Sequence, residues 1–273
     1  QKNSTTENFR RRDFQNSSNV NSGNDILSNS QNDTNVVASN LNANRDTILT
    51  ANNINIVSAT ELDLSSQSSS KTRLLASEKE TIDVTKTINK ASNINSGNSL
   101  LLQSGGDTNI ISSNVAVRTK DSDGNLIKGG DATIIAGKYT DETGTEIYDK
   151  DAKINIAAAQ DVETSIHKVE KMSVKINDVD KIAKGFATIY GTTGAIMSSY
   201  KIEYQDRKDT STTTTNQASN IDVANNLVTN SASNTNLLAS NINVGNDALM
   251  VAGTMNVNGV RSEEHTSELQ SPC

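Results

Sequence analysis

A short repeat constrains this chain more than any other feature. The tripeptide Ser-Asn-aliphatic recurs in three pairs, and the two members of each pair are 21 residues apart. The copies begin at Ser18, Ser39, Ser92, Ser113, Ser219 and Ser240. A repeat this short predicts a structural unit that must stack on its neighbours, because it cannot bury its own apolar side chains.

Each repeat contains three apolar pieces separated by Gly, Asn and Asp. In the last copy the pieces are Ile242 with Val244, Leu249 with Val251, and Met255 with Val257. Spacing by two is the strand pattern, and the spacers tolerate tight turns. The repeats therefore predict an all-β fold, a parallel β-helix of about 21 residues per coil. Parallel crossovers prefer a right-handed connection, so we expect a right-handed solenoid.

The predicted coils would stack in register. About seven coils at roughly 4.8 Å would make a rod of ~35 Å. Asparagine follows the serine in every copy, which predicts a ladder of side-chain amides along the stack. Its members would be Asn19, Asn40, Asn93, Asn114, Asn220 and Asn241.

The composition favours a thin column over a compact globule. The chain has 273 residues, no Trp, three Phe and five Tyr, and 33% of its residues are hydrophobic. A β-helix core needs only a column of Val, Ile, Leu and Ala. Disorder is the alternative for such a polar chain. We set it aside for the repeats and keep it for the connecting segments.

The pattern divides the chain into coils and excursions. Residues 1–17 form a polar return, residues 18–157 form coils, residues 158–216 form a long excursion, and residues 217–260 form coils again. Within the first block we expect an excursion near 60–87 and hairpins near 118–130 and 138–150, centred on Asp-Gly and Thr-Gly. The excursions are predicted to be hairpins or helices. The segment 169–183 fits either an amphipathic helix or a long strand.

The last thirteen residues, 261–273, break the pattern and match the translation of a common sequencing adapter, so we expect a non-native tail. It holds the only Cys and the only Pro, and without its one Arg and three Glu the net charge moves from −7 to −5. The first residues lack the apolar core of a signal peptide, so export would be encoded upstream. The longest uncharged stretch, 185–200, is too short and polar to span a membrane.

Few residues suggest catalysis or metal binding. His167 lacks a second His or Cys nearby in the sequence, so an exposed polar role is favoured over zinc binding. The 121–125 segment resembles the start of a calcium loop, but its glycine falls fourth instead of sixth, and Ala132 stands where Glu is needed. The pairs Gly105-Gly106 and Gly129-Gly130 lack the context of a phosphate loop and predict coil corners. We expect no cofactor and no metal.

Two basic or apolar segments leave alternatives open. The run Arg10-Arg11-Arg12 could contact phosphate, but an acidic chain of pI 4.9 would repel nucleic acid, so a solvated return is favoured. Half of all the aromatic residues lie between Ala183 and Tyr204. This segment predicts either a membrane or partner contact, or an element packed on the flank of the solenoid. The candidate contact residues are Phe186, Tyr190, Ile196, Met197, Tyr200 and Tyr204.

The segments SNINSGNSLLLQSGGDTNI, GGDATIIAG and DTSTTTTNQASNI resemble the haemagglutinin repeats of filamentous haemagglutinin-like exoproteins, including the stalks of contact-dependent inhibition proteins. The resemblance covers roughly residues 18–260. It implies a two-partner secreted protein of a Gram-negative bacterium, passed through an outer-membrane transporter and displayed as a fibre toward a host or neighbouring cell.

Three functions follow as expectations. The first is a structural stalk segment of an adhesin or toxin-delivery filament. The second is a delivery segment that engages a membrane or receptor through residues 183–204. The third is a β-helical polysaccharide enzyme, which would need carboxylates converging on one face, and the sequence scatters them. We therefore expect no enzymatic activity.

Overall fold

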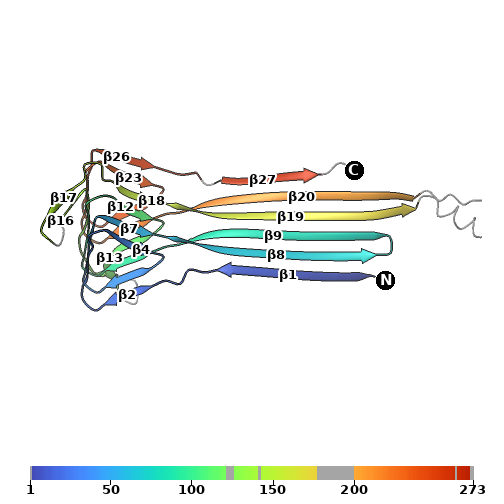
Figure 1. The fold of residues 1–273 in the computed structure, drawn as a ribbon, viewed down its shortest axis with the longest axis horizontal. Coiled ribbons are helices and arrows are strands. Elements are labelled where there is room, and N and C mark those ends of the chain that lie inside the picture. The colour runs from blue at the N-terminus through green and yellow to red at the C-terminus, as the bar shows by residue number, and fades with distance from the viewer. Residues whose placement is uncertain (1, 121–125, 141–142, 177–199, 262, 271–273) are drawn as a thin grey trace, which may run out of the picture.

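The computed structural model describes residues 2–120, 126–140, 143–176, 200–261 and 263–270. Every secondary-structure element in these ranges is a β-strand, so the all-β prediction is confirmed. Most of the strands form three parallel sheets wound into coils and one antiparallel sheet that projects to one side, and a separate two-stranded hairpin completes the fold (Figure 1).

Each coil contributes one strand to each of the three parallel sheets, and the sheets contain six coils in the described part of the chain. Sheet 1 is built from β2 (Asn19–Ser22), β5 (Asn40–Ala43), β10 (Asn93–Ser96), β13 (Asn114–Lys120), β21 (Asn220–Val223) and β24 (Asn241–Val244). Sheet 2 is built from β3 (Ile26–Asn29), β6 (Asp46–Ala51), β11 (Ser99–Ser104), β15 (Ala132–Ala136), β22 (Leu227–Ser231) and β25 (Ala248–Val251). Sheet 3 is built from β4 (Asp33–Val37), β7 (Asn53–Val57), β12 (Thr108–Ile111), β18 (Ile154–Ala157), β23 (Asn234–Leu238) and β26 (Thr254–Asn258). The expectation of about seven coils is therefore wrong by one.

The core is a narrow aliphatic column. Residues Ile54, Ile94, Leu102 and Ile134 are fully buried, and among the described residues no Phe belongs to the core cluster. Alternate residues of each strand point inward, as in β6, where Thr47, Leu49 and Ala51 are buried. Paired serines and threonines fill the corners, for example Ser96 and Thr47, whose hydroxyls are 2.6 Å apart. The aromatic-poor composition therefore suffices for this core.

The predicted amide ladder is confirmed across all six coils. In sheet 1 each Asn Nδ2 donates to the Oδ1 of its counterpart in the preceding coil, at 2.7 to 2.9 Å. Sheet 3 carries a second ladder of the same kind, which the sequence reasoning missed. Its members are Asn35, Asn55, Asn109, Asn155, Asn236 and Asn256.

The repeat serines, which directly precede the strands of sheet 1, form a further line of hydrogen bonds along the stack. The backbone N–H of each repeat serine donates to the Oγ of the equivalent serine in the next coil, at 3.2 to 3.3 Å. The Oγ of Ser92 in turn donates to the carbonyls of Val57 and Val36. The repeated Ser-Asn pair thus supplies both the serine contacts and the amide ladder.

The backbone conformation of the residue after each sheet 3 strand differs between coils that continue directly and coils that lead into an excursion. Ala38, Ser112 and Ala239 have φ of 46°, 47° and 46°, and each turns the chain directly into the following coil. At the ends of the second and fourth coils, after β7 and β18, the chain instead enters the antiparallel sheet. A left-handed residue therefore marks the coils that continue without an excursion.

The side sheet consists of six long antiparallel strands in the order β1-β8-β9-β19-β20-β27. Their bounds are β1 (Asn3–Asp13), β8 (Ala59–Arg73), β9 (Ala76–Lys90), β19 (Ala159–Ile176), β20 (Tyr200–Gln217) and β27 (Glu263–Gln270). The first five are the segments expected to be polar returns and excursions, so the disorder and helix alternatives are wrong for their described residues. The stretch 169–176 is strand, not helix. Tail residues 263–270 pair with β20, which does not test their expected foreign origin.

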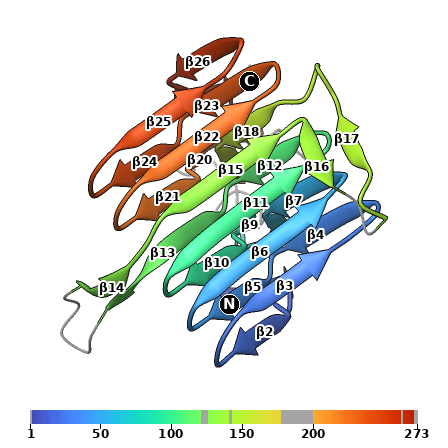
Figure 2. The ribbon, with the colours of Figure 1, turned by 90° about the vertical axis from the view of Figure 1, so that its left-hand side faces the viewer.

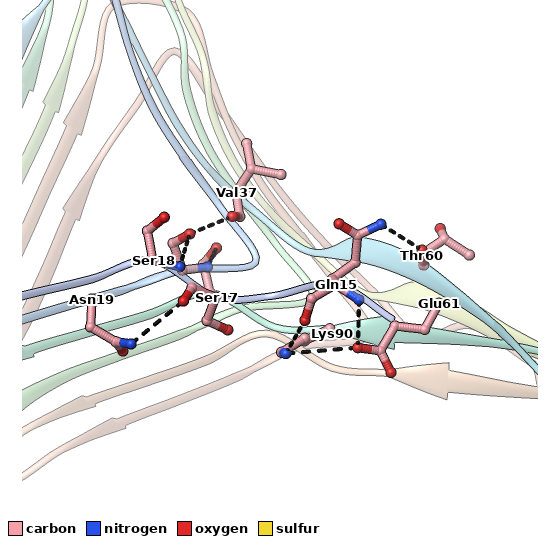
Figure 3. Close-up of polar contacts among 10 residues, drawn as sticks. Gln15, Ser17, Ser18, Asn19, Val37, Thr60, Glu61 and Lys90 are labelled. Carbon is pink, nitrogen blue, oxygen red and sulfur yellow. Dashed lines mark hydrogen bonds and ion pairs between the residues drawn. The ribbon is translucent and has the colours of Figure 1, made fainter. Parts of the chain in front are cut away.

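A polar junction ties the side sheet to the coils (Figure 3). The backbone N–H of Gln15 donates to the Glu61 carboxylate at 3.2 Å, and the Gln15 side chain donates to the Thr60 carbonyl at 3.3 Å. The Lys90 ammonium donates to the Gln15 carbonyl and lies 3.7 Å from Glu61. These contacts link β8, β9 and the segment after β1 where all three leave the column.

The fourth coil carries two hairpins. Strand β13 pairs with β14 (Leu126–Gly129), and β16 (Lys138–Thr140) pairs with β17 (Glu146–Tyr148). Residues 121–125, which include the calcium-like sequence, lie outside the described residues. Tyr139 of the second hairpin is fully buried, and a Cβ on Gly105 would lie 3.0 Å from its ring. The hairpins project from opposite ends of β15 (Figure 2).

Candidate contact site

Two of the six candidate contact residues, Tyr200 and Tyr204, lie in β20, at the end of the β19–β20 hairpin that is away from the coils (Figure 1). Phe186, Tyr190, Ile196 and Met197 lie outside the described residues. Tyr200 begins β20, and its backbone pairs with Ile176. Tyr204 lies opposite Met172 and is 53% exposed. Of the six candidates, the structure therefore describes the side chain of Tyr204.

The end of the hairpin has one apolar face. Met172 pairs with Tyr204 and Val174 pairs with Ile202, so these four side chains share one side of the sheet. Met172 is 44% exposed and Ile202 is 58% exposed. We call these four residues the tip patch. The Val174 N–H donates to the Leu75 carbonyl at 2.8 Å, which places the β8–β9 turn beside the patch.

The opposite face of the same strands is charged. Lys171 lies 3.0 Å from Glu78, and Lys175 lies 2.6 Å from Glu203. The hydrogen bond from Lys171 lowers the pKa of the Glu78 carboxyl, and that from Lys175 lowers the pKa of Glu203. An open hollow of about 780 Å³ at this end is bordered by residues that include Arg73, Lys171 and Tyr204. The hairpin end is thus amphipathic, with its apolar side open to solvent.

Sequence reasoning missed the tip patch although a signal was present. From Lys171 to Ile176, and again from Tyr200 to Tyr204, apolar and polar residues alternate. This alternation is the period of a strand with one apolar face. The two runs become one surface only because β19 and β20 pair in this register.

The other residues considered for metal or phosphate binding, His167 and the arginines of β1, contact acidic residues of the side sheet. His167 Nε2 lies 2.8 Å from Glu80, and its Nδ1 lies 3.9 Å from Asp209. Within the described residues, no three His, Cys, Asp or Glu side chains come together in a metal-binding group. Arg10 and Arg12 both contact Asp63, at 2.7 and 3.0 Å, so these cations pair within the side sheet.

The glycine pairs lie at close approaches of the backbone. A Cβ on Gly130 would collide with the carbonyl of Asn98, and one on Gly106 would collide with the side chain of Asn53. Both glycines are buried at turns between strands. The part of the chain that the structure describes includes no helix long and apolar enough to cross a bilayer.

Comparison with known proteins gives one family. The family model described as Hemagglutinin repeat matches residues 1–121 and 116–271. Comparisons with curated proteins and with solved structures find no significant match. The family matches span the repeats, the ladders and the side sheet, and the chain therefore belongs to the hemagglutinin repeat family.

Proposed function

We propose that this chain is a structural stalk segment of a secreted, surface-displayed bacterial adhesin or contact-dependent toxin-delivery filament. The observation that carries the proposal is the sheet 1 amide ladder, which continues through every described coil. A continuous ladder distributes a load over all coils, as a stalk requires.

The winding is proposed to be that of a right-handed parallel β-helix with about 21 residues per coil. Register partners 21 residues apart, such as Asn19 with Asn40 and Asn220 with Asn241, support that repeat length. The preference of parallel crossovers supports the handedness.

The side sheet supports a fibre because it grows in step with the coils. Every two coils add two strands to each parallel sheet, and the excursion after them adds two strands to the side sheet. Neighbouring strands are roughly 4.8 Å apart in both kinds of sheet. For every two coils, the column and the side sheet therefore both lengthen by ~9.6 Å. The two parts can therefore lengthen together without strain.

Membership of the family supports a proposal about the surroundings of the stalk. We propose display on the surface of a Gram-negative bacterium, secretion through an outer-membrane two-partner transporter, and contact with a host or neighbouring cell. The net charge of −7 argues against nucleic acid as a partner. We propose no catalytic role, because hydrophobic stacking and amide ladders account for the repeated residues; a polysaccharide enzyme is the weakest alternative.

A pulling experiment tests the stalk. The chain is held by handles at Ser18 and Val260 and stretched in an optical trap. A stalk should resist and then yield in steps, of about 70 Å for a coil of 21 residues and longer for the second and fourth coils, whose excursions unfold with them. Smooth extension at low force, as for a flexible polymer, would count against the proposal.

A second function is contact with a membrane or receptor through residues 183–204. The tip patch favours it, because Ile202 and Tyr204 are more than half exposed at the end of an 18-residue strand. Co-sedimentation with phospholipid vesicles tests membrane contact, using the whole chain and the variant Ile202→Ser/Tyr204→Ser. The matched control is Phe9→Ser, which removes an apolar side chain of 58% exposure from the same sheet. Loss of binding in the tip variant alone would support contact, and no binding by the unaltered chain would leave the stalk function.

A further inference from the structure

An apolar row crosses the outer face of sheet 2. Backbone register aligns one residue from each coil in this row. Five of its six members are apolar and the fourth is a threonine; in order they are Leu27, Ile48, Leu101, Thr133, Val228 and Leu249. They point outward because their strand neighbours, such as Leu49 and Leu100, fill the core. Leu27 is 70% exposed and Leu249 is 57% exposed, and the four between them are partly exposed.

An acidic row runs beside the apolar row. It is formed by the residues two positions earlier in each coil, which are Asp25, Asp46, Ser99, Asp131, Asn226 and Asp247. Two positions along a strand place the rows about 7 Å apart. Four of the six are aspartates. Arg45 is a cation beside them and lies 3.6 Å from Asp25 and 3.9 Å from Asp46.

The acidic row is held in place by the stack. The backbone N–H of Asp46 donates to Asp25, and the side chain of Asn226 donates to Asp131 at 2.9 Å. Asp46 also accepts from Ser99 at 2.6 Å, and this hydrogen bond lowers the pKa of its carboxyl. These hydrogen bonds therefore hold the acidic row in a fixed line beside the apolar row.

Sheet 2 faces away from the side sheet, which leaves its outer surface accessible (Figure 2). The two hairpins of the fourth coil stand at opposite ends of β15. An occupant lying along the column would pass between them. An occupant lying parallel to the strands would meet them.

We propose that this face binds an amphipathic α-helix of a partner protein, with an apolar stripe on the apolar row and Lys or Arg along the acidic row. A helix presents one side chain per turn at ~5.4 Å along its axis, close to the ~4.8 Å between coils. A strand would present side chains on one face at ~6.7 Å, a spacing that does not match the distance between coils. Six coils span ~24 Å, which corresponds to about 16 helical residues.

The acidic row selects a partner helix that carries positive charge. Opposite charge beside an apolar stripe orients a helix and excludes an acidic one. Binding of an amphipathic helix through its apolar face is a general recognition mode. This interaction is independent of the stalk proposal, because it concerns what the outer face binds and not how the column bears load.

A designed peptide provides the probe. It is a 17-residue helix with Leu at positions i, i+3, i+4 and i+7 and Lys along one flank, and its counterpart carries Glu in place of Lys. Fluorescence anisotropy measures the binding of each to the full chain. The Lys peptide should bind, more weakly as salt rises, and the Glu peptide should bind at least about tenfold more weakly.

Variants locate the site. Leu101→Ser/Val228→Ser and Asp131→Asn/Asp247→Asn should each weaken the Lys peptide by about tenfold. The matched controls are Val57→Ser/Leu238→Ser on the outer face of sheet 3 and Glu163→Gln/Asp206→Asn on the side sheet, and these should bind normally. Circular dichroism verifies that each variant is folded. Absence of binding, equal binding of the Lys and Glu peptides, or an equal loss in the controls would overturn the proposal.

Discussion

The side-chain amide of Asn114 donates to the Oδ1 of Asn93 at 2.8 Å, although the two residues belong to different coils and are 21 positions apart. Asn93 in turn donates to Asn40 at 2.7 Å. Each ladder residue inside the stack therefore acts as donor and acceptor at once. Removing one side chain leaves unpaired groups on both sides.

Asn93→Leu is expected to destabilise the chain by about 1–3 kcal/mol, because a donor and an acceptor in neighbouring coils lose their partner. Urea denaturation followed by circular dichroism measures this change. Asn243→Leu serves as control, since Asn243 is exposed on the last coil and outside the ladder. An Asn93 variant with an unchanged unfolding midpoint would remove the ladder as a source of stability.

Ser112→Gly is expected to stabilise the chain by about 1 kcal/mol. Ser112 is fully buried, has a φ of 47°, and its Oγ has no hydrogen-bond partner among the described residues. Glycine relieves the left-handed backbone and removes the unpaired hydroxyl. The neighbouring change Ser113→Gly should act in the opposite direction, because the Ser113 Oγ accepts from Ser92 and donates to Ile111. Thermal unfolding of both variants compares them, and shifts of the same sign would contradict this account.

Gly130→Ala is expected to cost about 1–3 kcal/mol, because the added Cβ would collide with the backbone carbonyl of Asn98. A backbone atom cannot move aside as a flexible side chain would. Gly23→Ala is the matched change, since nothing lies within 4 Å of its Cβ position. Equal unfolding midpoints for the two variants would show that the corner is looser than described.

Asp46 should make stability depend on pH in the acid range. The hydrogen bond from Ser99 lowers the pKa of Asp46 in the folded state from its ordinary value of 3.8. The resulting stabilisation is full above the unfolded-state pKa and is lost as pH falls through the lower folded-state value. The stability difference between the unaltered chain and Asp46→Asn should therefore be larger at pH 7 than at pH 2, as urea titrations at both values can measure. A constant difference would exclude this contribution.

The coils could be predicted because their signals are local. Ser-Asn pairs, alternate aliphatics and Gly-Asn spacers recur within each repeat, and they were enough to predict the strands and the sheet 1 ladder. The sheet 3 ladder was harder to see, because its asparagines Asn109 and Asn155 are 46 positions apart although they lie in successive coils. The hairpins inside the fourth coil stretch this spacing and hide the shared phase.

The side sheet could not be predicted in the same way. Its strands are rich in Ser, Thr and charge on both faces, so no apolar alternation marks most of their length. Pairings such as Arg12 with Asp63 and His167 with Ile82 join distant segments through backbone hydrogen bonds. A backbone ladder leaves little trace in the sequence. For the same reason Met172 and Tyr204 could not be recognised as one surface before their register was known.

The side sheet gives the column of coils a preferred direction of bending. Its strands stack in the same direction as the coils and reach ~60 Å from the column, like the flange of a beam. Curvature within the plane of the flange would stretch or compress hydrogen bonds at its far edge. Curvature across that plane leaves their lengths nearly unchanged. A column built this way bends more easily about one axis than about the other.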